Sequence, residues 1–126
     1  MRDRRNLSDA ELEIMEVIWA AKSPVTSSFI KEKLSGKRDW ALSTLMTVLN
    51  RLIEKGVLQC DRSTRTNLYS ASITEQKYKA SESRDFLEKL YGNSLKNFVA
   101  GLIRENSVND SEIRELKAFL DSFEEE

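Results

Sequence analysis

The sequence has 126 residues, a net charge of −1 at pH 7, 40% hydrophobic residues and 33% charged residues, which is typical of a soluble globular protein. It contains no histidine and one cysteine, so it lacks the residues for a Ser-His or Cys-His nucleophile, a thiolate cluster or an internal disulfide. We therefore expect neither an enzyme nor a metal site, and no other cofactor.

The chain begins MRDRRNLSDAE, without an apolar run after the basic residues, so we expect no signal peptide. No apolar run approaches the roughly 18 residues that span a bilayer. These features predict a cytoplasmic protein that does not enter a membrane. The lone Cys60 fits a half-buried strand residue, and its neighbours give no support to a redox role or an intermolecular bridge.

Two short helices are predicted first. Ser8 and Glu11 have the spacing of a capping box, so a helix begins there, and it ends before Pro24. Thr26 is suited to cap a second helix, which Gly36 ends in a left-handed conformation.

A third helix, over about residues 41–55, has two contrasting faces on a helical wheel. The apolar side carries Leu42, Leu45, Val48, Leu49, Leu52 and Ile53. The polar side carries Ser43, Thr44, Thr47, Asn50, Arg51, Glu54 and Lys55, and Met46 lies at the border. An anchored apolar face opposite short polar and cationic side chains is what a helix needs to read base edges in the major groove. An ordinary solvated face is the alternative interpretation.

A β-hairpin is predicted next, with strands over residues 57–60 and 68–73. Its polar turn, residues 61–67, carries Arg62 and Arg65. Three helices followed by a hairpin is the order of a winged helix-turn-helix. A basic wing of this kind lies along the DNA backbone or the minor groove.

The predicted roles follow from this fold. Base reading is expected from Ser43, Thr44, Met46, Thr47 and Asn50, because Asn pairs with adenine and Met46 is suited to touch a thymine methyl. Contacts to the DNA backbone are expected from Arg51, Arg62, Arg65 and Arg5. The arm that carries Arg5 fits a solvated chain end equally well.

The distribution of charge along the chain supports DNA binding by the first part of the chain. Residues 22–65 contain nine cations and four acids, whereas residues 76–126 contain eight cations and eleven acids. One basic and one acidic part suggest that only the first meets a polyanion.

A helical region follows from Thr74, with a break at Gly92-Asn93 and N-cap candidates at Asn109, Asp110 and Ser111. Its apolar positions include Phe86, Leu90, Leu95, Phe98, Val99, Leu102, Ile113, Leu116 and Leu120. Three short helices cannot bury so much apolar surface among themselves, and a second copy of the chain is the simplest cover. Folding back onto the N-terminal part is the alternative.

The sequence thus predicts a mainly α fold with a small β-hairpin. Residues 1–75 are expected to form a winged helix-turn-helix DNA-binding domain, and residues 76–126 a helical dimerisation domain.

Five stretches resemble the penicillinase-repressor family of bacterial transcriptional regulators, which is of the BlaI/MecI type with the copper repressor CopY as a relative. They are LSDAELEIMEVIWA, PVTSSFIKEKL, DWALSTLMTVLNRLIEKGVL, the hairpin ending NLYSASIT, and NSLKNFVAGLI. The combination D-W-x(3)-T-x(2)-T-x(3)-R-L-x(2)-K-G-x-L is quite specific, and the resemblance covers nearly the whole chain.

The resemblance implies a homodimer that binds a palindromic operator and represses transcription. Thr44, Thr47 and Arg51 match positions of the family's recognition helix. Met46 stands where staphylococcal relatives have an arginine, and Leu42-Ser43 where they have Pro-Lys, so the family's base preference does not carry over at these positions.

The resemblance also implies inactivation by a protease at an Asn-Phe bond, which Asn97-Phe98 matches, although Phe98 is equally well explained as a core residue. Copper-sensing relatives end in a cysteine-rich tail, whereas this chain ends DSFEEE, so we do not expect release by copper. The competing hypothesis for the whole chain is a winged-helix protein-interaction module without specific DNA binding.

Overall fold

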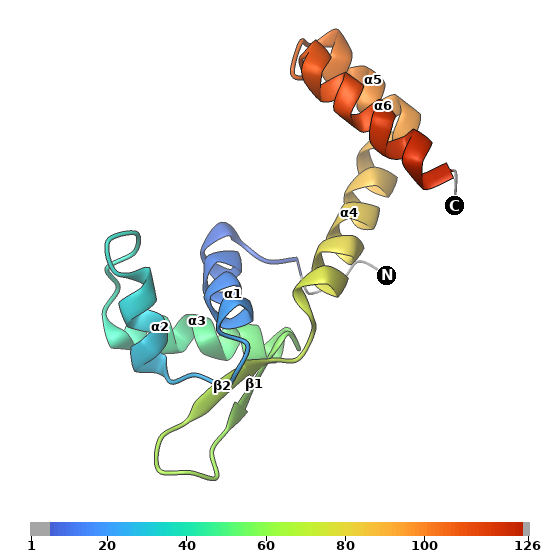
Figure 1. Ribbon diagram of the computed structural model, residues 1–126. Helices are drawn as coiled ribbons and strands as arrows, with labels where there is room; N and C mark the ends of the chain where they lie inside the picture. Colours follow the sequence, from blue (N-terminus) through green and yellow to red (C-terminus); the bar gives the residue numbers. More distant parts are fainter. Residues whose placement is uncertain (1–5, 125–126) are drawn as a thin grey trace. The chain divides into compact units, whose positions relative to one another are not determined.

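Helix α1 (Asp9–Ala21) begins at the predicted capping box. The Ser8 Oγ accepts a hydrogen bond from the Glu11 N–H (3.2 Å), and the Glu11 carboxylate accepts one from the Ser8 N–H (2.9 Å). The computed structural model describes residues 6–124, and Figure 1 shows its elements. The Arg5 position predicted to meet DNA lies outside these residues.

Helix α2 (Ser27–Leu34) also begins and ends as predicted. The Thr26 Oγ1 accepts a hydrogen bond from the Phe29 N–H at 3.1 Å. Gly36, with a φ of 90°, follows the helix in the left-handed conformation that favours glycine. Helix α3 (Leu42–Glu54) starts after a short loop.

The hairpin pairs β1 (Leu58–Asp61) with β2 (Leu68–Ala71) in antiparallel fashion, and Cys60 lies opposite Tyr69. Val25, in the loop before α2, forms two backbone hydrogen bonds with Tyr69, at 2.9 and 2.7 Å. The loop between α1 and α2 is therefore tied to the hairpin as an additional short bridge.

The strands differ from the prediction, because β1 keeps its four residues but is shifted by one position and β2 is two residues shorter. The N–H of Val57 donates to the carbonyl of Leu52 (3.2 Å) and closes the end of α3, so β1 starts one residue later. At the other end, the carbonyl of Ile73 accepts a hydrogen bond from the indole N–H of Trp19 (2.9 Å). The flanking residues thus also contact α3 and α1, while the Ser72 N–H still donates across the hairpin to the Val57 carbonyl at 2.8 Å.

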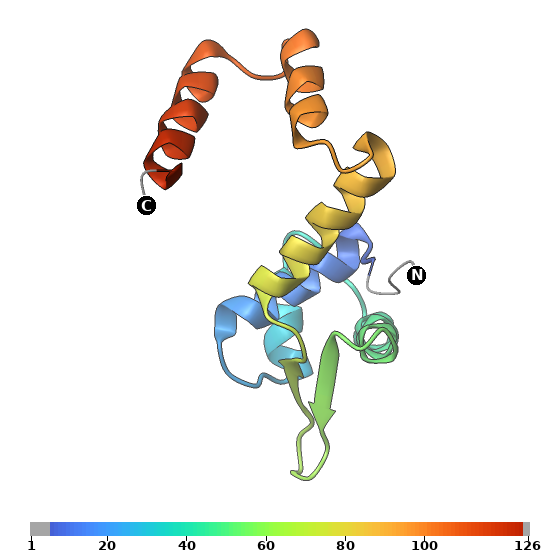
Figure 2. The same cartoon turned by 90° about the vertical axis from the view of Figure 1, so that its right-hand side faces the viewer.

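One apolar core joins α1, α2, α3 and the hairpin. Figure 2 views α3 nearly along its axis, beside β1. The fully buried side chains include Ile14, Met15, Ile30, Leu45, Leu49, Leu52, Val57 and Tyr69. Leu42 is an exception to the helical wheel, because it is 50% exposed instead of lying in the core. It is the first residue of α3, and the buried positions of that helix begin only at Leu45.

The chain divides into two compact units, Met1–Ser81 and Glu82–Glu126, and the division lies within α4 (Glu75–Tyr91). The start of α4 belongs to the first unit because Tyr78 is buried against Trp19, with ring centroids 5.8 Å apart. The boundary predicted from the sequence, between residues 75 and 76, instead falls at the beginning of this helix.

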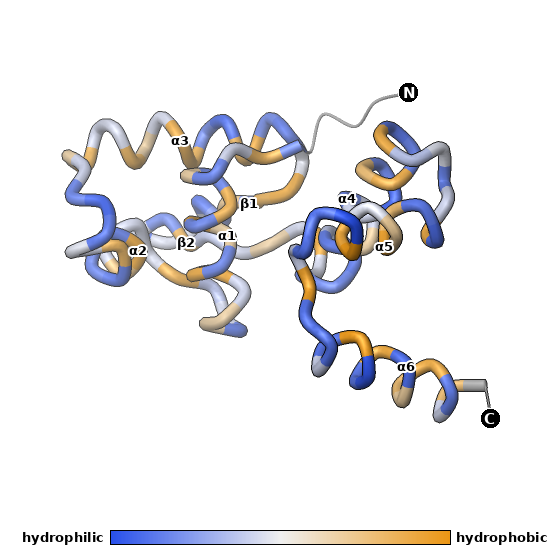
Figure 3. Tube along the Cα trace, turned by 90° about the horizontal axis from the view of Figure 1, so that it is seen from above, coloured by the Kyte–Doolittle hydropathy of each residue, from blue (hydrophilic) through white to orange (hydrophobic). Residues whose placement is uncertain are grey.

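The second unit contains the rest of α4, α5 (Leu95–Arg104) and α6 (Asp110–Glu124). Gly92 and Asn93 both have positive φ values and make the predicted break. The Asn109 side chain accepts a hydrogen bond from the Glu112 N–H (2.8 Å) before α6. Orange and blue segments alternate along α6 in Figure 3, as expected of an amphipathic helix. Among the described residues, no helix has the length and apolar composition to cross a membrane.

Candidate nucleic-acid interface

The outward face of α3 brings the predicted base-reading residues together. Ser43, Thr44, Thr47 and Asn50 are exposed, while the opposite side of the helix is held in the core by Leu45, Val48, Leu49 and Leu52. The Thr47 hydroxyl donates a hydrogen bond to the carbonyl of Ser43 at 3.1 Å. Its oxygen then remains an acceptor for a base amino group, such as adenine N6 or cytosine N4.

The first turn of α3 has no side-chain cap. Ala41 is its N-cap residue and cannot accept a hydrogen bond through its side chain. The first N–H groups of the helix therefore have no capping oxygen from the N-cap side chain, and a DNA phosphate is a suitable acceptor for them. This uncapped start was not among the features predicted from the sequence, although an alanine at the start of a helix signals it.

Met46 is less available than the other predicted base-reading residues. Its side chain is half-buried, and its sulfur lies 3.9 Å from the hydroxyl of Tyr69 on β2. Burial raises the pKa of the Tyr69 phenol and the neighbouring Cys60 adds to this, so the hydroxyl stays protonated and able to donate. Met46 thus helps to join α3 to the hairpin.

The turn that leads into α3 is fixed to α1 by an ion pair. The Arg38 guanidinium makes two hydrogen bonds to the Glu13 carboxylate, at 2.5 and 3.3 Å, and lies 5.5 Å from the ring centroid of Trp40. The hydrogen bond from Arg38 lowers the pKa of the Glu13 carboxyl. Arg38 is therefore committed to positioning this turn rather than free for a phosphate.

The far end of α3 is fixed by a second, more buried pair. The Lys55 Nζ lies 2.6 Å from the carboxylate of Glu11, which is 4% exposed, and it also donates to the carbonyl of Asn6 (3.1 Å). Burial raises the pKa of Glu11, but hydrogen bonds from Lys55 and Ser8 outweigh it, so the pKa is lowered overall. Both ends of α3 are thus held by ionic contacts to α1.

The hairpin turn presents two free cations. Arg62 and Arg65 are exposed, and neither forms an ion pair within the described part of the chain. The nearby Asp61 carboxylate accepts hydrogen bonds from the N–H and hydroxyl of Ser63, at 2.9 and 2.6 Å. These bonds lower the pKa of Asp61 and hold its carboxylate within the turn. Arg51, exposed on α3, likewise forms no ion pair among the described residues.

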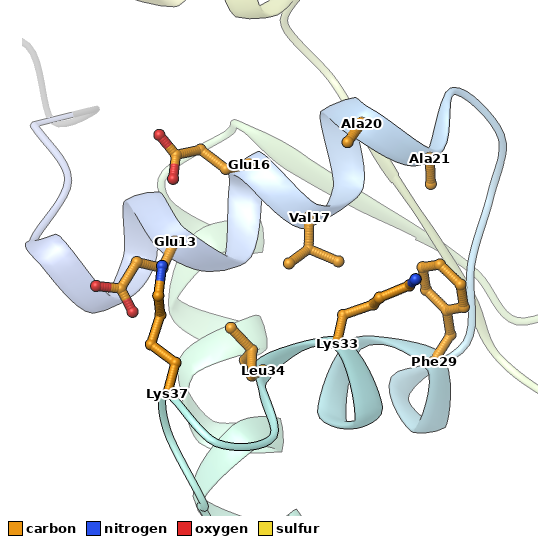
Figure 4. Close-up of a pocket in the computed structure, with 9 residues that line it drawn as sticks. All are labelled: Glu13, Glu16, Val17, Ala20, Ala21, Phe29, Lys33, Leu34 and Lys37. Atoms are coloured by element: carbon orange, nitrogen blue, oxygen red, sulfur yellow. The ribbon is translucent and has the colours of Figure 1, made fainter.

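A groove of about 430 Å³ between α1 and α2 has a different character. Figure 4 shows its apolar residues, including Val17 and Leu34, together with acidic side chains from α1 and lysines from α2 and the residues just after it. Two of these charged residues are already engaged: Glu13 by Arg38, and Lys33, whose Nζ lies 5.5 Å from the Phe29 ring centroid. Charges of both signs, some of them already engaged within the chain, do not favour binding of a polyanion at this groove. The cations near α3 and in the hairpin turn do favour it.

The predicted dimerisation residues are left largely uncovered within the second unit. Phe86, Leu90, Leu95, Leu116 and Leu120 are between 41% and 62% exposed. The remaining four, Phe98, Val99, Leu102 and Ile113, are half-buried. An apolar groove of about 570 Å³ runs between α5 and α6, lined by seven of the nine predicted residues.

Three aromatic contacts add to this surface. Phe98 lies edge-on to Phe86 and Tyr91, at centroid distances of 5.9 and 5.4 Å. Phe119 and Phe123 stack at 6.4 Å and are each more than 60% exposed. The predicted set omitted Tyr91, Phe119 and Phe123, although the spacing of four residues between Phe119 and Phe123 was a usable signal.

Comparison with known proteins gives a consistent result. The sequence profile of a family described as "Penicillinase repressor" matches residues 7–122. A penicillinase repressor from Bacillus licheniformis is 36% identical over 121 residues, which is 96% of this chain and 94% of the relative.

Two solved structures are similar to the first part of the chain. The solution structure of the DNA-binding domain of the repressor BlaI has a TM-score of 0.52 and 37% identity, covering 62% of this chain and 94% of its own. The monomeric form of Bacillus licheniformis BlaI in complex with the blaP half-operator has a TM-score of 0.51, with the same identity and coverage.

Proposed function

We propose that this chain, which belongs to the penicillinase repressor family, represses transcription as a homodimer bound to a palindromic operator. One observation carries the proposal: exposed Ser43, Thr44, Thr47 and Asn50 share a face of α3, which is anchored at both ends. The hairpin turn of the same unit carries two arginines that form no ion pair with any residue of the described range 6–124. The solved complex of a relative with a half-operator supports DNA as the partner.

Each surface has a separate task in this proposal. The N-terminal part of α3 enters the major groove, where Asn50 pairs with adenine and the hydroxyls of Ser43, Thr44 and Thr47 contact base edges. The exposed Arg51, Arg62 and Arg65 contact phosphates and displace their counterions. Arg5, on the N-terminal arm, adds a further phosphate contact.

The second unit supplies the dimer. Leaving a leucine or phenylalanine side chain in water forfeits roughly 1.5–3 kcal/mol of burial. The groove between α5 and α6, with exposed Leu95, Leu116 and Leu120 around it, gains this energy when a second copy covers it. A two-fold dimer requires two half-sites about one DNA turn apart, or a multiple of it, which makes the operator palindromic.

Selection of bound duplexes from a random library, with the full chain at about 0.15 M salt, tests this function. We expect enrichment of a palindromic sequence, and a mass of two chains on each duplex. A folded protein that enriches no sequence would contradict the proposal and favour a protein-interaction module. Enrichment of a single half-site without two-fold symmetry would contradict the dimer alone.

We also propose that a protease inactivates the repressor at Asn97-Phe98. This bond lies in the first turn of α5, where the Asn97 and Phe98 N–H groups are hydrogen-bonded to Ser94. Because proteases bind extended chains, this turn has to unwind before cleavage. Immunoblots of induced cells are expected to reveal a fragment ending at Asn97, and Phe98→Gly is expected to abolish it. The same fragment from the variant would refute this route.

A further inference from the structure

Leu42 is an exposed leucine at an unusual place. It is 50% exposed, and it is the one large apolar side chain described before Phe86 that is exposed to this degree. Single exposed leucines are common on protein surfaces, so exposure alone says little. The position is more informative, because Leu42 is the first residue of α3 and is followed directly by exposed Ser43 and Thr44.

The neighbouring apolar residue on the same edge of α3 is already engaged. Met46 lies one turn after Leu42, and its half-buried side chain contacts the Tyr69 hydroxyl through sulfur at 3.9 Å. Leu42 therefore offers the freer apolar side chain at the end of α3 that enters the groove in DNA-reading helices.

We propose that Leu42 contacts the C5-methyl group of a thymine in each half-site and selects thymine at that base pair. This inference rests on the proposed function and adds a base-reading residue that the helical wheel had assigned to the core. The C5-methyl of thymine is the large apolar group that a base pair displays in the major groove, beside hydrogen-bond donors and acceptors. Covering both apolar groups removes water from each.

The test uses a duplex selected by the protein itself, in which each thymine is replaced in turn by deoxyuridine. This change deletes one methyl group and leaves the hydrogen-bonding edge intact. Burial of one such carbon is worth a factor of about four in affinity. We expect one thymine per half-site whose replacement weakens binding about four-fold, and we expect Leu42→Ala to bind both duplexes equally.

Two controls keep the result interpretable. Glu16→Ala, which removes an exposed side chain from α1, is the control variant, and it is expected to retain the preference for thymine over deoxyuridine. Circular dichroism of Leu42→Ala is expected to match the parent because the side chain has little part in the core. If this variant nevertheless unfolds, Leu42→Gln, which keeps the length of the side chain, provides the same comparison.

Several outcomes overturn the inference. They are a selected site without thymine, an operator in which no deoxyuridine weakens binding, and a Leu42→Ala protein that still distinguishes thymine from deoxyuridine. Each of these leaves specific binding intact and so contradicts only the role of Leu42. A library that yields no enriched sequence contradicts the proposed function itself, and the role of Leu42 falls with it.

Discussion

Replacing both arginines of the hairpin turn is expected to change how binding depends on salt. Arg62 and Arg65 are exposed and have no ion-pair partner among the described residues, so Arg62→Ala/Arg65→Ala removes charge without disturbing an internal contact. Each phosphate neutralised contributes about 0.9 to the slope of log affinity against log salt. The double variant measures this contribution directly.

The size of the effect follows from the dimer. Two protomers together present roughly four such guanidinium groups, so the slope is expected to become shallower by about 3.6. Between about 50 and 200 mM salt, the parent protein then loses roughly 100-fold more affinity than the double variant does. Each single variant is expected to account for about half of the change in slope.

Fluorescence anisotropy with a labelled selected duplex, repeated over this range of salt, provides the slopes. Arg104→Ala is the matched control, because it removes an exposed arginine from α5 in the second unit and is expected to leave the slope unchanged. Equal slopes for the parent and the Arg62→Ala/Arg65→Ala protein would refute the assignment of the hairpin turn as a phosphate-binding wing.

Three further predictions concern base reading, stability and assembly. Asn50→Ala is expected to reduce discrimination at one base pair by about 1–3 kcal/mol without changing the salt slope, and Thr47→Ala is expected to have a weaker effect of the same kind. Competition with substituted duplexes measures this discrimination. Unchanged discrimination in both variants would show that the reading face lies elsewhere. Glu11→Gln leaves Lys55 without its charged partner and is expected to lower the free energy of unfolding at pH 7 by about 2 kcal/mol, measured with urea. The lowered pKa of Glu11 means that its carboxylate stabilises the fold above the unfolded-state pKa and loses this effect as pH falls through the lower folded-state pKa. The stability difference between the two proteins is therefore expected to shrink as the solution is made acidic, and a constant difference would contradict the pairing. Leu116→Asp is expected to convert the dimer to a monomer in sedimentation experiments while the first unit stays folded, whereas a dimer of unchanged affinity would contradict the proposed interface.

Local signals made the helix boundaries predictable from the sequence. The structure confirms three such signals, each of which acts within a few residues of its own position. They are the capping box of Ser8 and Glu11, the N-cap at Thr26 and the left-handed Gly36. The periodicity of α3 likewise identified which residues face the core beyond its first turn. A helical wheel assumes that the core extends along the whole helix. This assumption does not hold for Leu42, which lies at the very start of α3, where the side chain is exposed.

Contacts between distant residues were not predictable in this way. Arg38 and Glu13 are 25 positions apart, and Lys55 and Glu11 are 44 apart, so no local pattern relates them. The same holds for Tyr69 and Met46, whose contact decides how available Met46 is for DNA. Charge composition indicated a basic region, but only the folded chain separates cations that are paired internally from those that are free.

The two tryptophans occupy sites that make them separate optical reporters. The Trp19 indole is held by its hydrogen bond to Ile73 and its contact with Tyr78 at the start of α4, whereas Trp40 lies beside Arg38 in the turn before α3. In a Trp40→Phe protein, intrinsic fluorescence follows only the junction between the first unit and α4, and in a Trp19→Phe protein it follows only the turn that leads into the reading helix. Emission from the Trp19→Phe protein therefore responds to bound DNA. Emission from the Trp40→Phe protein reports whether Tyr78, at the start of α4, stays in contact with Trp19.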